Sequence, residues 1–131
     1  MESGTEVKNE TLPPNSVDVI EFNNLLSGAL DPNRAWEPFH PGVDISRLYD
    51  IPDGMASAFL RFTPGAKLPR HLHVGHEHIF ILDGSQQDET GIHHAGTMLL
   101  HPPDTCHTVS SPEGCLVLAI WGKPVKFQEN P

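Results

Sequence analysis

The chain has 131 residues and a net charge of −9, with eight lysines and arginines against seventeen aspartates and glutamates. Nucleic-acid binding is disfavoured, because phosphate contacts need clustered basic side chains and the eight present are dispersed. No apolar run approaches the roughly 18 residues of a membrane span, and the N-terminus lacks the basic and apolar regions of a signal peptide. We therefore expect a cytoplasmic protein that contacts neither nucleic acid nor membrane.

The first part of the chain is polar and precedes a region that is long enough for one domain. Residues 1–14 are charged and end in two prolines, which predicts a flexible N-terminal arm. Residues 15–131 are expected to form a single domain with a core of its own. Within it, the mixed apolar pattern of residues 17–30 predicts a short strand followed by a helical turn around residues 22–26.

The next stretch predicts paired strands. Thirteen prolines and eleven glycines lie between short apolar runs, a composition typical of all-β proteins with many turns. A strand over residues 43–51 is followed by the turn signal Asp53-Gly54 and by a second strand over residues 55–63. Side chains of this second strand alternate, so we expect one set to face inward (Ala56, Ala58, Leu60 and Phe62) and the other outward (Ser57, Phe59 and Arg61).

Residues 65–84 carry two histidines one residue apart, followed by a carboxylate. His71 and His73 fall on one face of a strand because its side chains alternate, and Glu77 keeps this parity. Gly75 lacks a Cβ and so suits the short turn that returns the carboxylate to the same point. Imidazole and carboxylate groups are donors for divalent metal ions, and three adjacent ligands rarely close a site alone. A fourth ligand is expected elsewhere.

After this stretch, the sequence predicts a tight turn at Asp83-Gly84, a short polar strand over residues 86–90 and a loop over residues 91–96. Residues 96–107 then form an apolar strand that two prolines interrupt before His107, the candidate fourth ligand. The last strand, residues 115–121, is apolar throughout and should be buried on both faces.

The other histidines and the cysteines receive separate predictions. His76 and His78 have the opposite parity and should point away from the ion, whereas His93 and His94 are expected in a solvated loop. The side on which His101 lies stays open. If the strands around Cys106 and Cys115 form a hairpin, the two sulfurs are about 13 Å apart, well beyond the Cα separation of about 7 Å that a disulfide allows. Both are therefore expected to be free thiols.

Together the two stretches resemble the paired motifs of the cupin family. The framing residues stand at the family's spacings: Gly65, His71, His73, Glu77 and Gly84 in the first motif, and Gly96, Pro102 and His107 in the second. Asp104 replaces a usual glycine and Ser111 a frequent asparagine, but aspartate tolerates the left-handed backbone that a turn glycine supplies. The resemblance implies an all-β fold, a cupin-type antiparallel β-barrel or jelly roll with a short N-terminal helical segment.

Residues 36–121 also resemble the cupin domain of ChrR-type anti-sigma factors and stand-alone cupin dioxygenase-like proteins, within the RmlC-like group. The similar stretches are Pro41-Gly42-Val43, Ser46-Arg47-Leu48, Leu68-Pro69-Arg70-His71 and Ile81-Leu82-Asp83-Gly84-Ser85. ChrR-type factors have a separate zinc-binding helical module that holds the sigma factor. The His-x3-Cys-x2-Cys run of that module is missing here. The resemblance therefore supports the fold and the ligands but not sigma-factor inhibition.

The resemblance implies one divalent metal ion per chain, held by His71, His73, Glu77 and His107. Fe(II) and Zn(II) are the leading ions, with Mn(II) and Ni(II) also open, and an octahedral ion would keep two positions for water, substrate or O₂. The first hypothesis is a non-haem, metal-dependent dioxygenase that acts on a small oxygen-containing organic substrate, with Glu77 able to leave the metal and act as a base. Its dry pocket would be lined by Leu60, Phe62, Val109 and Leu118.

Two other functions stay open, because the fold does not fix the reaction. One is a zinc-binding, ChrR-like sensor or structural module without turnover, and the other is a metal-dependent isomerase or lyase. The enzyme reading implies a small-molecule ligand or substrate as partner. A homodimer is also expected, since Phe59, Phe80 and Trp121 are predicted to face outward and offer apolar surface.

Overall fold

The computed structural model describes residues 18–52 and 54–128, so the expected arm over residues 1–14 lies outside the described residues. Within these residues, one helix and ten strands follow one another in sequence. They are α1 (Leu25–Ala29), β1 (Glu37–His40), β2 (Val43–Asp50), β3 (Ala56–Phe62), β4 (Ala66–Leu72), β5 (Glu77–Asp88), β6 (Gly91–His94), β7 (Met98–His101), β8 (Cys106–Ser111), β9 (Cys115–Trp121) and β10 (Lys126–Phe127).

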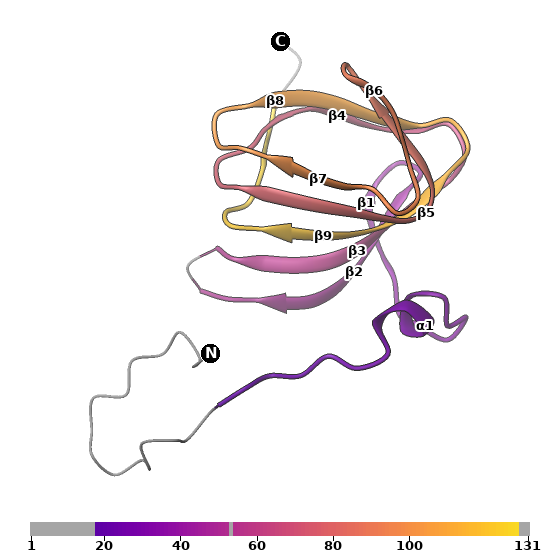
Figure 1. Ribbon diagram of the computed structural model, residues 1–131, viewed down its shortest axis with the longest axis vertical. Coiled ribbons are helices and arrows are strands. Elements are labelled where there is room, and N and C mark those ends of the chain that lie inside the picture. Colours follow the sequence, from indigo (N-terminus) through magenta and orange to yellow (C-terminus); the bar gives the residue numbers. More distant parts are fainter. Residues whose placement is uncertain (1–17, 53, 129–131) are drawn as a thin grey trace, which may run out of the picture.

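The strands form one curled antiparallel sheet. They follow the order β1-β2-β3-β9-β5-β8-β4-β10, and β6 and β7 also pair with β5. Figure 1 shows β4 and β8 on one side of the curl and β7, β5, β9, β3 and β2 on the other, with α1 outside the sheet. The predicted all-β antiparallel barrel with a short N-terminal helix is confirmed. Among the described residues, no helix is long and apolar enough to cross a membrane.

Strand β5 joins the two sides of the curl. Its first half pairs with β7 and β9, and its second half pairs with β6 and β8. The predicted turn at Asp83-Gly84 is wrong, because β5 continues through these residues with a bulge between Ile81 and Asp83. Gly84 has a φ of 76°, and a Cβ there would overlap the carbonyl oxygen of Gly114. A glycine is therefore needed at position 84, both for the bulge in β5 and for the close approach of the Gly114 backbone.

The predicted hairpin between the strands that carry the two cysteines is also wrong. Strand β8 pairs with β4 and β5, whereas β9 pairs with β3 and β5. Both cysteines are free, as expected. Cys115 is buried, and this burial raises the pKa of its thiol to about 11, whereas Cys106 is half-buried. Cys115 is therefore an unreactive core side chain at neutral pH.

The inner face of the sheet forms the larger part of the core. Ala58, Leu60 and Phe62 of β3 are buried there, as the alternation predicts, together with Ile79 and Ile81 of β5. Strand β9 is buried on both faces over most of its length, also as predicted. Its inner residues pack into this core, whereas Leu116 and Leu118 face the opposite way.

Phe59 lies on the outer face of β3, as predicted, but the prediction that its side chain is exposed is wrong. Phe59 is fully buried, because Ala29 and Leu25 of α1 cover the outer face of β3 and pack with Leu116 of β9. The guanidinium carbon of Arg34 lies 4.7 Å from the centre of the Phe59 ring, a cation–π distance. The helix thus gives part of the outer face a second, smaller core, which strand alternation alone does not reveal.

Replacing Phe59 should therefore be costly. We expect Phe59→Ala to lower the free energy of unfolding by about 3–5 kcal/mol, the usual range for a buried phenylalanine. The control is Ile92→Ala on β6, where the side chain is 53% exposed, with an expected loss of about 0.5 kcal/mol or less. Urea unfolding of the metal-free protein measures both losses. Equal losses would contradict the cover that α1 gives to β3.

Candidate metal site

His71 and His107 face each other across two neighbouring strands. They are direct partners in the register of β4 and β8, so both side chains point to the same face of the sheet. Both are buried, and their Nε2 atoms lie 3.0 Å apart. A register shift in β4 between Leu68 and His71 sets this alignment. The pair thus brings one residue from each sequence motif into contact.

His73 follows β4 and is held by the turn of the second motif. Its backbone N–H donates to the carbonyl oxygen of Thr105 at 2.8 Å, and its own carbonyl accepts from the N–H of Asp104 at 2.8 Å. Asp104 has a φ of 70°, so the prediction that aspartate takes the left-handed conformation of the usual glycine is confirmed. A Cβ on Gly75 would meet the backbone of Lys123 at 2.7 Å, which explains the glycine in the next turn.

Glu77 begins β5 and lies between two neighbouring strands. Its register partners are His101 in β7 and Trp121 in β9. Its Oε1 lies 3.1 Å from His73 Nε2 and 3.0 Å from His101 Nδ1, while its Oε2 accepts a hydrogen bond of 2.6 Å from Trp121 Nε1. The carboxylate is therefore buried but surrounded by polar atoms on both oxygens.

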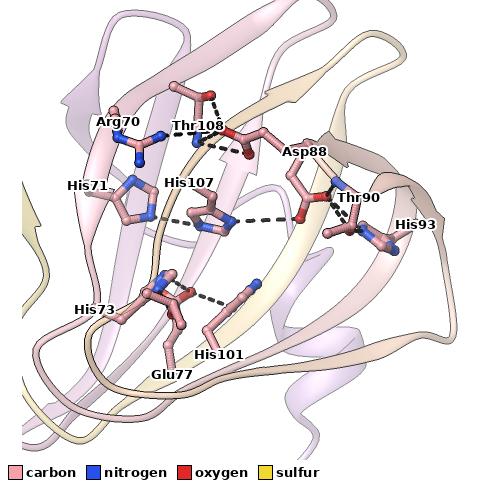
Figure 2. Close-up of polar contacts among 12 residues, drawn as sticks. Arg70, His71, His73, Glu77, Asp88, Thr90, His93, His101, His107 and Thr108 are labelled. Carbon is pink, nitrogen blue, oxygen red and sulfur yellow. Dashed lines mark hydrogen bonds and ion pairs between the residues drawn. The ribbon is translucent and has the colours of Figure 1, made fainter.

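The structure brings together all four residues that the motifs predict. The donor atoms of His71, His73, Glu77 and His107 lie within 4.8 Å of one another, and all four side chains are buried. Figure 2 shows the imidazoles and the carboxylate directed at one another across the interior of the sheet. The Nε2 of His73 is buried without a hydrogen-bond partner, as a nitrogen aimed at an ion would be. This cluster could hold a divalent metal ion.

The outer nitrogens of the imidazoles are fixed by other parts of the chain. His71 Nδ1 lies 2.9 Å from the carbonyl oxygen of Pro69, which only accepts, so Nδ1 carries the proton. Thr105 Oγ1 donates to Pro102 and lies 2.9 Å from His73 Nδ1, so it accepts the proton of that nitrogen. Both rings are therefore in the tautomer that carries its proton on Nδ1. This tautomer leaves Nε2, which faces the other donors of the cluster, free to bind a metal ion.

The protonation of the cluster also suits a metal. Burial and the neighbouring imidazoles lower the pKa of His107 to about 4, and burial likewise lowers the pKa of His71. Burial alone would raise the pKa of Glu77, but the contacts with His101 and His73 outweigh it and hold the pKa well below its usual range. At neutral pH the cluster therefore has neutral His71 and His107 beside an ionised carboxylate, so these donors need not lose protons to bind an ion.

Comparison with known proteins gives the family. The family model of the ChrR Cupin-like domain matches residues 31–124, well over half of the chain. The chain belongs to this cupin family. Its fold is similar to that of an RmlC-like cupin protein from Ralstonia eutropha, which is 25% identical, with a TM-score of 0.67 over 77% of this chain and 71% of that chain. No curated protein matches the sequence.

Two further solved structures share the cupin fold. An acetylacetone dioxygenase from Acinetobacter johnsonii is 14% identical, with a TM-score of 0.72 over 96% of this chain and 86% of that one. The Rhodobacter sphaeroides anti-sigma factor ChrR, solved in complex with SigE, is 21% identical, with a TM-score of 0.61 over 82% of this chain and 70% of that chain. At these identities the likeness is one of fold.

The remaining histidines of this cupin mostly lie where they were expected. His76 and His94 are exposed, and His78 lies half-buried outside the cluster. The prediction of a loop is wrong for both His93 and His94, since both belong to β6. His94 is solvated as expected, whereas His93 is half-buried and its Nε2 lies 3.1 Å from Asp88 Oδ1. Asp88 in turn lies 3.7 Å from His107 Nδ1 through its other oxygen. His93 is thus connected to the cluster through a carboxylate.

Two participants were missed by the sequence reasoning, Trp121 and Asp88, and the side of a third, His101, had been left open. His101, Trp121 and Asp88 all approach the cluster, and Trp121 was expected to face outward, whereas it is buried. His101 and Trp121 are both register partners of Glu77 and share its face of the sheet. The register of β5 with β7 and β9 places both residues beside Glu77. The sequence reasoning did not predict this register, because it placed a turn at Asp83-Gly84, where β5 continues.

Two cavities border the site of this cupin. One, of about 340 Å³, is lined by the site imidazoles His73, His101 and His107 and by residues from the ends of β5, β7 and β8 that include Leu99 and Cys106. The other, of about 210 Å³, is mainly apolar and includes Trp121 and Phe127, whose ring lies 5.3 Å from that of His71. The lining expected from sequence is wrong: Leu60, Phe62 and Val109 are in the core and Leu118 packs on the outer face.

The lowered pKa values of His71 and His107 predict a pH-dependent stability of the metal-free protein. In the unfolded chain both imidazoles take up a proton below about pH 6.5, whereas in the folded state His107 does so only at about pH 4. The unfolded state therefore binds more protons in this window, and the free energy of unfolding should fall as the pH is lowered from about 6.5 to 4. Above that window these two groups should contribute no slope.

Urea unfolding in the presence of a chelator, at several values between pH 4 and pH 7.5, measures this dependence. His71, His73, His101, Glu77 and Asp88 all lie around His107, so the slope reports the environment of the whole cluster. His107→Gln should flatten the slope, and the exposed His94→Gln should leave it unchanged. A wild-type stability that is constant over the window would contradict the argument.

Proposed function

We propose that this cupin binds one divalent metal ion per chain through His71, His73, Glu77 and His107, and that it is a non-haem metal-dependent dioxygenase. Its substrate would be a small organic molecule that binds through oxygen atoms. The observation that carries the proposal is a buried cluster of imidazoles and one carboxylate beside a cavity of about 340 Å³. A cavity of this size fits a small ligand.

The donor set suits several first-row metals, and the choice of metal decides the chemistry. Bound iron would supply the redox activation of O₂, whereas zinc would polarise a substrate or activate water. Neutral imidazoles and a single carboxylate leave a divalent ion with one net positive charge. Such a centre attracts an anionic oxygen donor, for example the enolate of a β-diketone.

Within this proposal Glu77 acts as a ligand and not as a base. Its pKa is held well below the usual range of a carboxyl group by the neighbouring imidazoles, so it is a poor proton acceptor at neutral pH. Trp121 also fixes one of its oxygens through a 2.6 Å hydrogen bond, which opposes the swing that a base would need. Trp121 is therefore a positioning residue for the carboxylate.

The cavity gives a substrate direct access to the imidazoles. His73, His101 and His107 line it, and Leu99 contributes apolar wall. An apolar wall favours the hydrocarbon part of a small substrate and displaces water from the reacting atoms. The shared fold of the acetylacetone dioxygenase supports a β-diketone as the first compound to test, because that protein's name identifies such a substrate.

A second function, a zinc-binding sensor or structural module without turnover, has its own support. The family takes its name from ChrR, which is an anti-sigma factor in the complex with SigE. Cys106 precedes His107 and lines the same cavity, so an oxidant that reaches the metal also reaches this thiol. Oxidation with release of zinc and no substrate turnover would favour the sensor.

The dioxygenase proposal predicts metal-dependent oxygen uptake. The Fe(II)-loaded protein should consume O₂ with acetylacetone or another small oxygen-rich substrate, and the Zn(II) form should not, because zinc has no accessible redox change. An oxygen electrode measures uptake with the Fe(II), Mn(II), Ni(II) and Zn(II) forms. Elemental analysis of the same samples gives the metal content per chain.

Variants of the proposed ligands and variants of exposed histidines together test whether metal binding and activity depend on this site. His73→Ala and His107→Ala should lose metal and activity together, while His76→Ala and His94→Ala, which change exposed histidines, should keep both. Full metal content without oxygen uptake in any form or with any substrate class would reject the dioxygenase and leave the metal site standing. Full metal content in His107→Ala would reject the ligand assignment.

We also propose that the protein is a homodimer, through a surface that differs in part from the predicted one. Phe59 and Trp121 are buried, so only Phe80 of the three expected residues is available. Strand register places further exposed apolar residues beside it on the outer face of β5, β7 and β9. This outer patch consists of Phe80, Met98, Leu100 and Ile120, which are 37%, 63%, 55% and 37% exposed.

The outer patch predicts a concentration-dependent association that one charge should disrupt. Wild-type protein is expected to have the mass of a dimer in light scattering at micromolar concentration, and Leu100→Glu should shift it towards the monomer. Ile92→Glu is the control, since Ile92 is 53% exposed on β6, outside the patch. A wild-type monomer, or an equal effect of both variants, would contradict a dimer through this surface.

A further inference from the structure

Among the imidazoles proposed as ligands, His107 has a charged group beside its outer nitrogen. Its Nδ1 lies 3.7 Å from Oδ2 of Asp88, the last residue of β5. The outer nitrogens of His71 and His73 instead contact a carbonyl and a hydroxyl oxygen. Figure 2 shows Asp88 on the side of the His107 ring that faces away from His71. The carboxylate therefore lies behind the ring and not among the donor atoms of the proposed ligands.

The Asp88 carboxylate is held in place through its other oxygen. Oδ1 accepts hydrogen bonds from the backbone N–H of Thr90 at 2.8 Å and from the Thr90 hydroxyl at 2.6 Å, and His93 Nε2 lies 3.1 Å from it. The Asp88 side chain is only 8% exposed. These contacts on Oδ1 leave Oδ2 directed at His107. A negative charge is thus fixed beside a proposed ligand and largely shielded from water.

A fixed negative charge at this place would strengthen metal binding through His107. The separation of 3.7 Å is too long for a direct hydrogen bond but lies within the range of an ion pair. A divalent ion draws electron density from an imidazole that binds it, so the Nδ1–H side of the ring becomes more positive. A carboxylate on that side stabilises the bound form. Removing such a partner from a metal-ligating histidine typically costs about 10–100-fold in metal affinity.

A purely local role of Asp88 in the turn between β5 and β6 explains less. The hydrogen bonds from Thr90 need only an acceptor oxygen, which an asparagine side chain also offers. They do not explain a charge mostly removed from water, which is costly unless an opposite charge is near. His93 supplies an opposite charge only when it is protonated. A cation bound by His107 would supply one at neutral pH.

We infer that Asp88 is a positioning residue that acts through His107 and supplies the second negative charge of the metal centre. The inference rests on the metal binding proposed above and narrows the substrate class. Glu77 and Asp88 together balance the charge of a divalent ion, and Asp88 also lines the cavity of about 340 Å³. The cavity should therefore favour a neutral substrate that binds through a carbonyl or hydroxyl oxygen over one that carries a permanent carboxylate.

Asp88→Asn tests the inference, because it keeps the acceptor oxygen and removes the charge. The affinity for Zn(II), measured by competition with a chelating dye, should fall about 10–100-fold. The affinity of the Co(II)-loaded protein for azide, a small anion whose binding changes the visible absorption, should rise about 3–10-fold, because the carboxylate no longer repels it. The two shifts have opposite signs, whereas damage to the fold would weaken the binding of both.

Two further variants serve as controls. Asp88→Glu keeps the charge and should lose less metal affinity than Asp88→Asn. Glu89→Gln removes the same charge from the next residue, which lines the same cavity but is 51% exposed and lies 3.7 Å from Arg70. Solvent and Arg70 screen the Glu89 charge, so both affinities should change less than about threefold. An effect equal to that of Asp88→Asn would contradict a specific role for Asp88.

The other outcomes can be told apart. The absence of either shift in Asp88→Asn would overturn the inference and leave the four-residue site intact. Two metal ions per chain in the wild type would also overturn it, since the donor atoms of Asp88, His101 and His107 lie within 4.8 Å of one another and would form a second site. A wild type that binds no metal would reject the proposed function itself. If Asp88→Asn does not fold, Asp88→Ser removes the same charge and is measured in the same way.

Discussion

The burial of the Glu77 carboxylate is the constraint on which the rest of the site depends. A charge removed from water costs several kcal/mol unless polar partners surround it. The partners here come from three parts of the chain: His73 after β4, His101 at the end of β7 and Trp121 at the end of β9. The ends of these strands must meet at the start of β5 for the carboxylate to be tolerated. The same arrangement concentrates nitrogen donors around one point.

The sequence was informative where the structure depends on neighbouring residues. Strand alternation related His71 to His73, and the turn chemistry of Asp104 was anticipated from its tolerance of positive φ. It was uninformative where distant strands meet. Trp121 and His101 reach Glu77 only through the register of β5 with β9 and β7, and a bulge at Asp83 was mistaken for a turn. Phe59 appeared exposed because the contact with α1 has no local signal.

The two faces of the sheet carry different features of this cupin. The inner face of the sheet carries the larger core and the buried cluster, whose members lie on or beside β4, β5 and β8. The outer face carries α1 over one part and exposed apolar residues over another. The proposed enzyme and sensor functions would use the same inner cluster and would differ in what reaches it. Cys106 and the imidazoles share one cavity, so substrate access and oxidant access follow the same route.

The turn that clamps His73 has a consequence for how the protein folds. Thr105 holds the His73 ring from 32 positions away, and Trp121 holds Glu77 from 44 positions away. Contacts between residues so far apart in sequence form only after long loops have closed, and proteins rich in them fold slowly. A fragment that ends before β9 contains the four donor residues but lacks Trp121 and the strand that pairs with β3 and β5. Metal binding during refolding would therefore report that the sheet has formed. A metal ion added before the strands pair would meet the donor residues while they are still far apart.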